Sequence, residues 1–87
     1  MIRVMIVEDE ALERKALQFL MDKYFKDKIE VVALLANGQK AIEFEENNKV
    51  DLILMDIQMP IKNGIEAARI IRQRNDQVKI IILTAHS

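Results

Sequence analysis

The chain has 87 residues, of which 51% are hydrophobic and 31% charged, and 13 basic and 14 acidic side chains leave a net charge of −1. This length allows one domain with a small core, and the near-neutral charge argues against a surface that coats nucleic acid. The absence of cysteine and the single histidine exclude disulfide scaffolds, thiolate metal sites and His-rich zinc sites. No apolar run is long enough to span a membrane and the first residues do not form a signal peptide, so we expect a cytoplasmic protein.

The first third of the chain predicts a strand followed by a helix. Residues 3–7 form a short apolar run that is typical of a buried strand. Residues 10 to about 25 repeat apolar side chains every three or four positions, which predicts an amphipathic helix. The side chains that we expect this helix to turn inward are Leu12, Ala16, Leu17, Leu20, Met21 and Tyr24.

The middle of the chain predicts a second strand and a short helix. The strand covers residues 30–35, and the turn signal Asn37-Gly38 follows it. The helix covers residues 39–46 and leads into a polar loop at 47–49. Three glutamates are expected on a solvated face of this helix, although one of them occupies a position where an inward-facing apolar residue would fit. They are Glu43, Glu45 and Glu46, and Glu45 is the exception.

The last third predicts two more strands, over residues 51–55 and 79–84. Between them lie a loop at 59–63, which contains Pro60, and a helix at 65–74. The residues of this helix that we expect to face inward are Ala68 and Ile71. The arginines that we expect to complement its dipole are Arg69, Arg72 and Arg74.

The predicted strands are continuously apolar rather than alternating, which indicates burial on both faces. That pattern is typical of a parallel sheet covered by helices. Strands that alternate with helices, joined by right-handed crossovers, give an open, doubly wound α/β sheet. Because ligands of such sheets bind beyond the carboxyl ends of the strands, the residues that follow each strand are the candidate site.

Acidic residues occupy these positions. Glu8 and Asp9 follow the first predicted strand, and Asp56 follows the third. If these two strands are neighbours, three carboxylates converge at one edge, and a divalent cation would relieve their mutual repulsion. Oxygen ligands without a nearby histidine or cysteine suit Mg²⁺ or Ca²⁺ rather than Zn²⁺.

A magnesium site of this kind suits phosphoryl transfer. Mg²⁺ leaves coordination positions for phosphate oxygens, and a carboxylate can attack phosphorus to form an aspartyl-phosphate. Asp56 is the better nucleophile, because it ends a central strand where a loop begins, and Asp9 is the better metal ligand. Thr84, at the end of the fourth strand, is placed to donate its hydroxyl to a phosphoryl oxygen.

At these residues the sequence resembles the receiver domain of two-component response regulators. The resemblance covers essentially residues 1–87 and rests on three blocks: residues 7–10, residues 51–60 with Gly64 following, and residues 82–85. The central block, Asp-x-x-Met-Pro-x-x-x-Gly, is specific to the family. The resemblance implies a flavodoxin-like fold with strand order 2-1-3-4, in which the family's fifth strand is absent from this chain.

The resemblance also implies a role for each matching residue. Asp56 corresponds to the phosphoacceptor, which a sensor histidine kinase loads. Mg²⁺ would bind Asp9 and Asp56 directly, Glu8 through water, and the backbone carbonyl of Gln58. Thr84 corresponds to the switch hydroxyl. The remaining positions are Ala85 and Pro60, at the active site, and Gln58 and His86, which tune the lifetime of the phosphoryl group.

The sequence departs from the family after the fourth strand, because it ends at Ser87. We therefore expect a C-terminally incomplete receiver without the family's fifth strand, whose final lysine pairs with the phosphoryl group. The fourth strand would then be an apolar sheet edge, and such edges template association. We expect either that the parent chain continues or that the chain forms a homodimer, edge to edge through this strand or by exchange of elements.

The leading hypothesis is a phosphoacceptor signalling domain that is not an enzyme. Its phosphorylation would change binding to an effector domain or partner protein outside this chain, with no membrane and no direct nucleic-acid contact. One alternative is a truncated receiver that keeps the fold without switching and acts as an interaction or dimerisation module. Another is a Mg²⁺-dependent phosphatase of the haloacid-dehalogenase type, although that family needs a second aspartate where this chain has Gln58.

Overall fold

The structure is a computed structural model that describes residues 1–59 and 61–83. Strands and helices alternate along the described chain, and each predicted element is confirmed with its ends shifted by at most one residue. The predicted end of the fourth strand, Thr84, lies outside the described residues. The elements are β1 (Ile2–Val7), α1 (Ala11–Phe25), β2 (Ile29–Leu35), α2 (Gly38–Asn47), β3 (Leu52–Asp56), α3 (Gly64–Arg74) and β4 (Lys79–Leu83).

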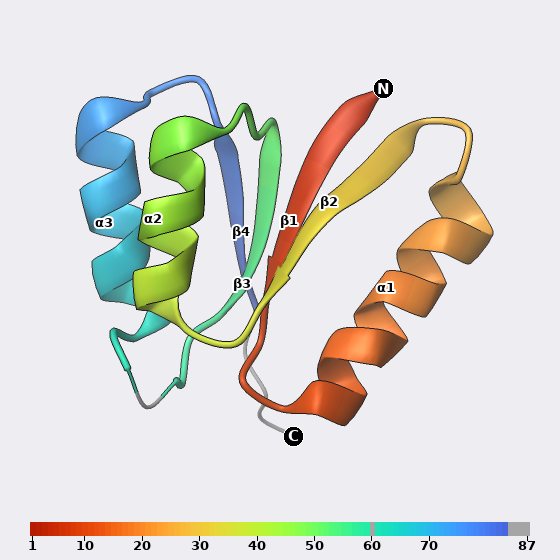
Figure 1. Ribbon diagram of the computed structural model, residues 1–87, viewed down its shortest axis with the longest axis horizontal. Coiled ribbons are helices and arrows are strands. Elements are labelled where there is room, and N and C mark those ends of the chain that lie inside the picture. The colour runs from red at the N-terminus through yellow and green to blue at the C-terminus, as the bar shows by residue number, and fades with distance from the viewer. Residues whose placement is uncertain (60, 84–87) are drawn as a thin grey trace.

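The four strands form one parallel sheet in the order β2-β1-β3-β4. This order confirms the predicted flavodoxin-like topology of the described strands. In the register of the central pair, Val4 lies opposite Leu52 and Val7 opposite Met55. The carboxyl ends of all four strands therefore lie at the same end of the sheet, which we call its carboxyl edge (Figure 1).

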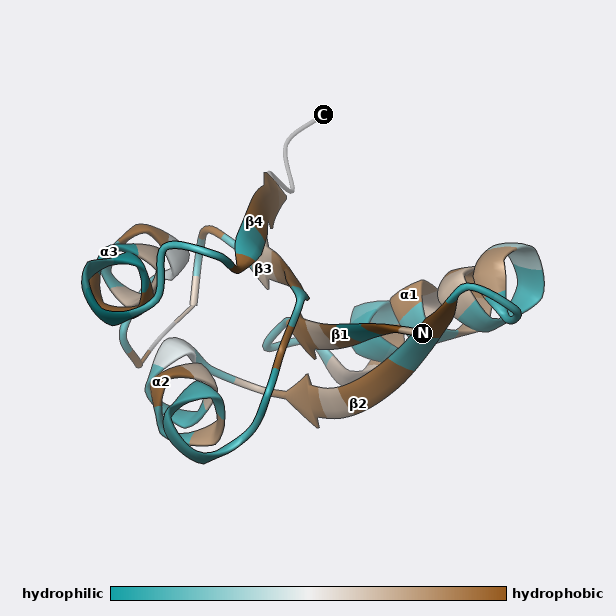
Figure 2. Cartoon of the chain, turned by 90° about the horizontal axis from the view of Figure 1, so that it is seen from above, coloured by the Kyte–Doolittle hydropathy of each residue, from teal (hydrophilic) through white to brown (hydrophobic). Residues whose placement is uncertain are grey.

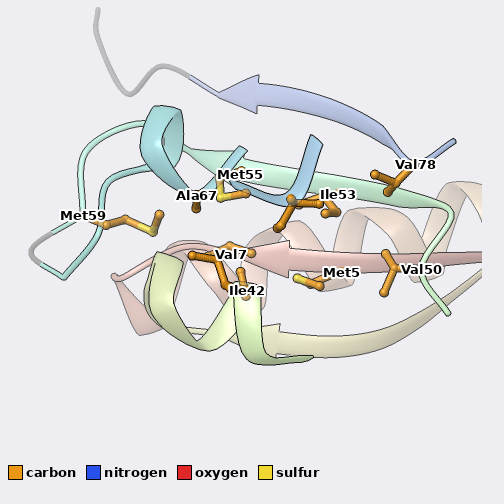
Figure 3. Close-up of a cluster of buried hydrophobic side chains, with 11 residues drawn as sticks. Met5, Val7, Ile42, Val50, Ile53, Met55, Met59, Ala67 and Val78 are labelled. Atoms are coloured by element: carbon orange, nitrogen blue, oxygen red, sulfur yellow. The ribbon is translucent and has the colours of Figure 1, made fainter. Parts of the chain in front are cut away.

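Helices cover both faces of the sheet, with α2 and α3 on one face and α1 on the other (Figures 1 and 2). The larger core lies under α2 and α3, and it includes Met5, Met55 and Met59, as Figure 3 shows. A smaller core under α1 consists of Val4, Ile6 and Leu54 with partly buried neighbours. Among the described residues, no helix combines the length and apolar character that crossing a bilayer would need.

Burial on both faces is confirmed for the central strands only. β1 and β3 each contain four consecutive buried residues, whereas β2 and β4 are half-exposed. On β4, which is an edge of the described sheet, Ile81 is 48% exposed. A continuous apolar run thus marks a strand correctly, but it does not distinguish the centre of this sheet from its edges.

Two of the helices begin at asparagines that cap them. The side chain of Asn37 accepts a hydrogen bond from the amide of Lys40 at 2.9 Å, and Asn63 accepts one from the amide of Glu66 at 2.9 Å. Such caps satisfy amide groups that have no partner within the helix. They fix where the loops after β2 and β3 end.

The prediction for the inward face of α1 is largely wrong. Leu17 and Met21 pack against the smaller core as predicted, but Leu12 is 80% exposed and Tyr24 is 65% exposed. The other two predicted inward residues, Ala16 and Leu20, are also exposed. Apolar side chains lie on several sides of this helix, so their spacing does not identify the face that meets the sheet.

On α3, one of the two inward-facing predictions is confirmed. Ile71 is fully buried together with Ala67, which precedes it by one helical turn. Ala68 is only half-buried. Its Cβ is rotated about 100° around the helix from that of Ala67, away from the line that faces the core.

The predicted solvated face of α2 is wrong for Glu45, which is buried. Its Oε1 accepts a hydrogen bond from Nε of Arg74 at 2.7 Å, and its Oε2 accepts one from Nδ2 of Asn75 at 2.8 Å. Arg74 also donates to the carbonyl of Ile42. The carboxylate therefore joins α2 to the end of α3, and Arg74 does more than complement a helix dipole.

Replacing Glu45 by alanine removes the acceptor for two donors at this helix contact. We expect Glu45→Ala to lower the free energy of unfolding by about 1–3 kcal/mol, the range for leaving buried hydrogen-bonding groups without a partner. Urea unfolding measures this change in the free energy of unfolding. The matched control is Glu43→Ala, because Glu43 lies on the same helix but is exposed; we expect a change within about 0.5 kcal/mol. Equal losses in both variants would contradict the role of Glu45.

Candidate metal centre

The three predicted acidic residues meet at the carboxyl edge of the sheet. Asp56 is the last residue of β3, and Glu8 and Asp9 directly follow β1. Since Val7 lies opposite Met55 in the parallel pair, Glu8 and Asp56 leave the sheet side by side. One carboxylate oxygen of each of the three residues lies within 4.8 Å of the others. The convergence that the sequence predicts is therefore present.

The backbone around these carboxylates is held by hydrogen bonds. The amide of Glu8 donates to the carbonyl of Leu35 at 2.9 Å, which ties the end of β1 to the end of β2. Oε2 of Glu8 accepts from the amide of Glu10 at 3.0 Å, and Oδ1 of Asp56 accepts from the amide of Gln58 at 3.3 Å. Glu8 and Asp56 are each only 3% exposed, whereas Asp9 is open to solvent.

The cluster has an excess of negative charge. Within the described ranges, no side-chain nitrogen of a lysine or arginine lies within 4.0 Å of an oxygen of the three carboxylates. The pKa of Glu8 is raised from 4.5 to about 7, chiefly by burial. The hydrogen bond from the amide of Glu10 opposes this rise, whereas side-chain contacts with Asp9 and Glu13 and the charge of Asp56 contribute to it. A compact group of oxygen ligands with unbalanced charge fits a hard divalent cation such as Mg²⁺.

Gly64 sets the distance between the phosphoacceptor candidate and α3. Its amide donates to the carbonyl of Ile57 at 3.1 Å. A Cβ at this position would lie 2.2 Å from the carbonyl oxygen of Asp56, which is too close for any side chain. The glycine of the sequence block therefore lets α3 begin directly against the end of β3.

Of the other predicted site residues, only Gln58 lies within the described part of the chain. Gln58 is exposed, two residues beyond Asp56, and contacts it through its amide. Pro60, Thr84, Ala85 and His86 lie outside the described residues. The roles predicted for them stay predictions.

Two residues of α1 that no sequence motif marks also border the cluster. Glu13 lines a cleft of about 230 Å³ together with Glu8, Asp56 and Leu83. Arg14 donates hydrogen bonds to the backbone carbonyls of Glu8 and Asp9. Both residues lie about one helical turn beyond Asp9, so the predicted start of the helix is the signal that could have found them.

The raised pKa of Glu8 predicts a pH dependence of stability. The folded protein holds a proton on Glu8 up to about pH 7, whereas the unfolded chain releases it near pH 4.5. Because the folded state binds more protons in this interval, Glu8 makes the free energy of unfolding fall as the pH rises from about 4.5 to 7. We expect Glu8→Gln to remove this contribution, which urea unfolding in EDTA at several pH values measures.

Glu43→Gln is the control, since this exposed carboxyl should leave the pH profile as it is in the wild type. A Glu8→Gln profile that parallels the wild type between pH 5 and 8 would show that Glu8 does not hold the extra proton.

Comparison with known proteins assigns the family. The family model described as the response regulator receiver domain matches residues 4–87. The transcriptional regulatory protein LnrK of Bacillus subtilis (strain 168) is 34% identical over 84 residues, which are 97% of this chain and 37% of LnrK. The chain thus spans well under half the length of this relative.

Two solved structures of the response regulator TrrA are similar to this fold. TrrA from Thermotoga maritima in complex with Mg²⁺-BeF has a TM-score of 0.83 and 33% identity, over 100% of this chain and 72% of TrrA. TrrA in complex with the histidine kinase ThkA has a TM-score of 0.85, with the same identity and coverage. Together with the match over residues 4–87, these likenesses show that the chain belongs to the response regulator receiver domain family.

Proposed function

We propose that the chain is a phosphoacceptor signalling domain, in which Asp56 takes a phosphoryl group from the phosphohistidine of a sensor histidine kinase. The observation that carries this proposal is the convergence of Glu8, Asp9 and Asp56 to within 4.8 Å at the sheet edge. Membership of the receiver family and the kinase-bound structure of TrrA support it.

The proposed transfer is a single displacement at phosphorus. An oxygen of Asp56 forms the new bond to phosphorus, the bond to the histidine nitrogen breaks, and the electron pair stays on that nitrogen. Asp56 suits this role because it ends a central strand and its backbone is fixed on both sides, by β-pairing before it and by Gly64 against its carbonyl. When bound, Mg²⁺ would neutralise charge on the transferred group.

The proposed ligands of Mg²⁺ are Asp9 and Asp56 directly, Glu8 through water, and the backbone carbonyl of Gln58. The charge excess of the cluster and the exposure of Asp9, which leaves the ion open to incoming phosphate oxygens, support this assignment. Mg²⁺ takes only one or two carboxylates and keeps several waters, so there is room for the phosphoryl group. The Mg²⁺-BeF complex of TrrA agrees with this choice of ion.

The remaining site roles are part of the same proposal. Thr84 would donate its hydroxyl to the phosphoryl group, with Ala85 and Pro60 beside it. Gln58 and His86 would tune the lifetime of the phosphoryl group.

We further propose that phosphorylation changes binding to an effector domain or partner protein, in the cytoplasm. The relative LnrK is a transcriptional regulatory protein, which supports an output in transcription. A second proposed consequence of phosphorylation is a homodimer that forms through β4. The exposure of Ile81 on this outermost strand of the described sheet supports it. The domain would have no enzymatic activity beyond gaining and losing its own phosphoryl group.

Asp56→Asn tests the phosphoacceptor directly. With acetyl phosphate and Mg²⁺, we expect the full-length protein to gain one phosphoryl group by mass spectrometry, and Asp56→Asn to gain none, because an amide is a poor nucleophile. Asp76→Asn is the control, since Asp76 is an exposed loop residue, and it should be phosphorylated like the wild type. EDTA should abolish the reaction.

Other outcomes would overturn the proposal. If the wild-type protein gains no phosphoryl group and does not bind beryllofluoride with Mg²⁺, the remaining hypothesis is a domain that acts only as an interaction module. Repeated turnover of a phosphomonoester would instead indicate a phosphatase.

A further inference from the structure

The side chains of Glu8 and Asp9 point into the same cluster although the two residues are consecutive. In an extended strand, successive side chains point to opposite faces. β1 ends at Val7, so both residues lie in the turn that leads to α1. The direction of each side chain here depends on how the peptide groups of Glu8 and Asp9 are turned, and those groups need partners that hold them.

Arg14 supplies these partners. Its Nη1 donates to the carbonyl of Glu8 at 2.7 Å and to the carbonyl of Asp9 at 3.3 Å. The backbone of Arg14 is itself anchored in α1, because its amide donates to the carbonyl of Glu10 at 2.9 Å. With the amide of Glu8 bound to Leu35, the backbone of Glu8 is held on both of its sides.

The amide of Glu10 also holds this loop, because it donates to Oε2 of Glu8 at 3.0 Å, but it does not contact the carbonyls of Glu8 and Asp9 that Arg14 binds. The side chain of Glu10, the N-cap residue of α1, makes no capping bond, unlike the asparagines that begin α2 and α3. Arg14 forms no ion pair within 4.0 Å among the described residues. Its guanidinium therefore binds carbonyl oxygens and leaves the carboxylates of Glu8 and Asp9 available to a cation.

We propose that Arg14 is a positioning residue of the metal centre, which turns the peptide groups of Glu8 and Asp9 so that both carboxylates face Asp56. The inference rests on the proposed function, because the cation it serves is the Mg²⁺ proposed there. Groups that orient metal ligands from outside the coordination sphere typically change metal affinity by about 10–100-fold when removed.

Positioning and simple charge predict opposite results. A guanidinium beside a cation site repels the cation, so removing a residue that acts only through its charge would tighten Mg²⁺ binding. Removing a residue that positions the ligands weakens it. The sign of the change in the dissociation constant therefore separates the two roles.

The test measures Mg²⁺ binding to the full-length protein by isothermal titration calorimetry in four variants. We expect Arg14→Met, which loses every donor, to raise the dissociation constant at least about 10-fold. Arg14→Lys and Arg14→Gln should lie between this variant and the wild type, because each keeps a single donor nitrogen, at a different distance from the backbone. Lys15→Met, on the exposed neighbouring position, should bind like the wild type.

Two further readouts exclude a merely structural effect. Thermal unfolding in EDTA checks that each variant is folded, and amide NMR shifts of residues 8–10 without metal should change in Arg14→Met but not in Lys15→Met. If Arg14→Met does not fold, Arg14→Lys and Arg14→Gln carry the test. Weaker Mg²⁺ binding in both of these variants supports the positioning role of Arg14. The lysine variant is decisive, because it keeps the positive charge.

This inference alone is overturned if Arg14→Met binds Mg²⁺ as tightly as the wild type or more tightly. If Arg14→Met does not fold, the same result for Arg14→Lys or Arg14→Gln overturns it. A wild-type protein that does not bind Mg²⁺ overturns the proposed function together with it.

Discussion

The parallel pairing of β1 with β3 is the constraint on which the candidate site depends. Val7 lies opposite Met55, so the residue that follows each of them leaves the sheet at the same edge. Both strands are buried over their last four residues, and a shift of one residue in register would move each side chain from the core on one face to the core on the other. The hydrophobic core thereby fixes the place where Glu8 and Asp56 meet.

This arrangement has a cost in stability. Two carboxylates are buried at the end of the core, no basic side chain of the described residues forms an ion pair with them, and the pKa of Glu8 is raised to about 7, chiefly by burial. Charged groups that repel one another in a low-dielectric site destabilise the fold unless a counterion is bound. A buried cluster of carboxylates with a raised pKa, at the end of the sheet where parallel sheets bind ligands, is typical of a functional site.

The features that the sequence predicts well are those with a local signal. Each strand is a continuous apolar run, so its bounds could be predicted to within one residue, and the carboxylates Glu8, Asp9 and Asp56 come directly after two of those runs. The parallel arrangement follows from strands that alternate with helices. The strand order itself came from the resemblance to receiver domains, because no local pattern distinguishes a central strand from an edge strand.

The features that the sequence misses depend on contacts between distant elements. The sequence around Glu45 predicts a solvated face, whereas in the fold Arg74 and Asn75 contact this residue from positions about 30 residues away in the chain. The sequence does not identify the inward face of α1, because apolar residues such as Leu12 and Tyr24 lie outside the line that meets the sheet. It does not identify Arg14 either, because this side chain contacts backbone carbonyls, which no sequence motif displays.

The central claim is that Glu8, Asp9 and Asp56 share one divalent ion. Its most direct measurement replaces Mg²⁺ by Mn²⁺, whose unpaired electrons broaden the NMR signals of nearby nuclei. At substoichiometric Mn²⁺, the amides of Glu8, Asp9 and Asp56 should broaden first, and excess Mg²⁺ should reverse the effect. Broadening centred on Asp51, at the opposite edge of the sheet, or spread evenly over the acidic residues would contradict a shared site.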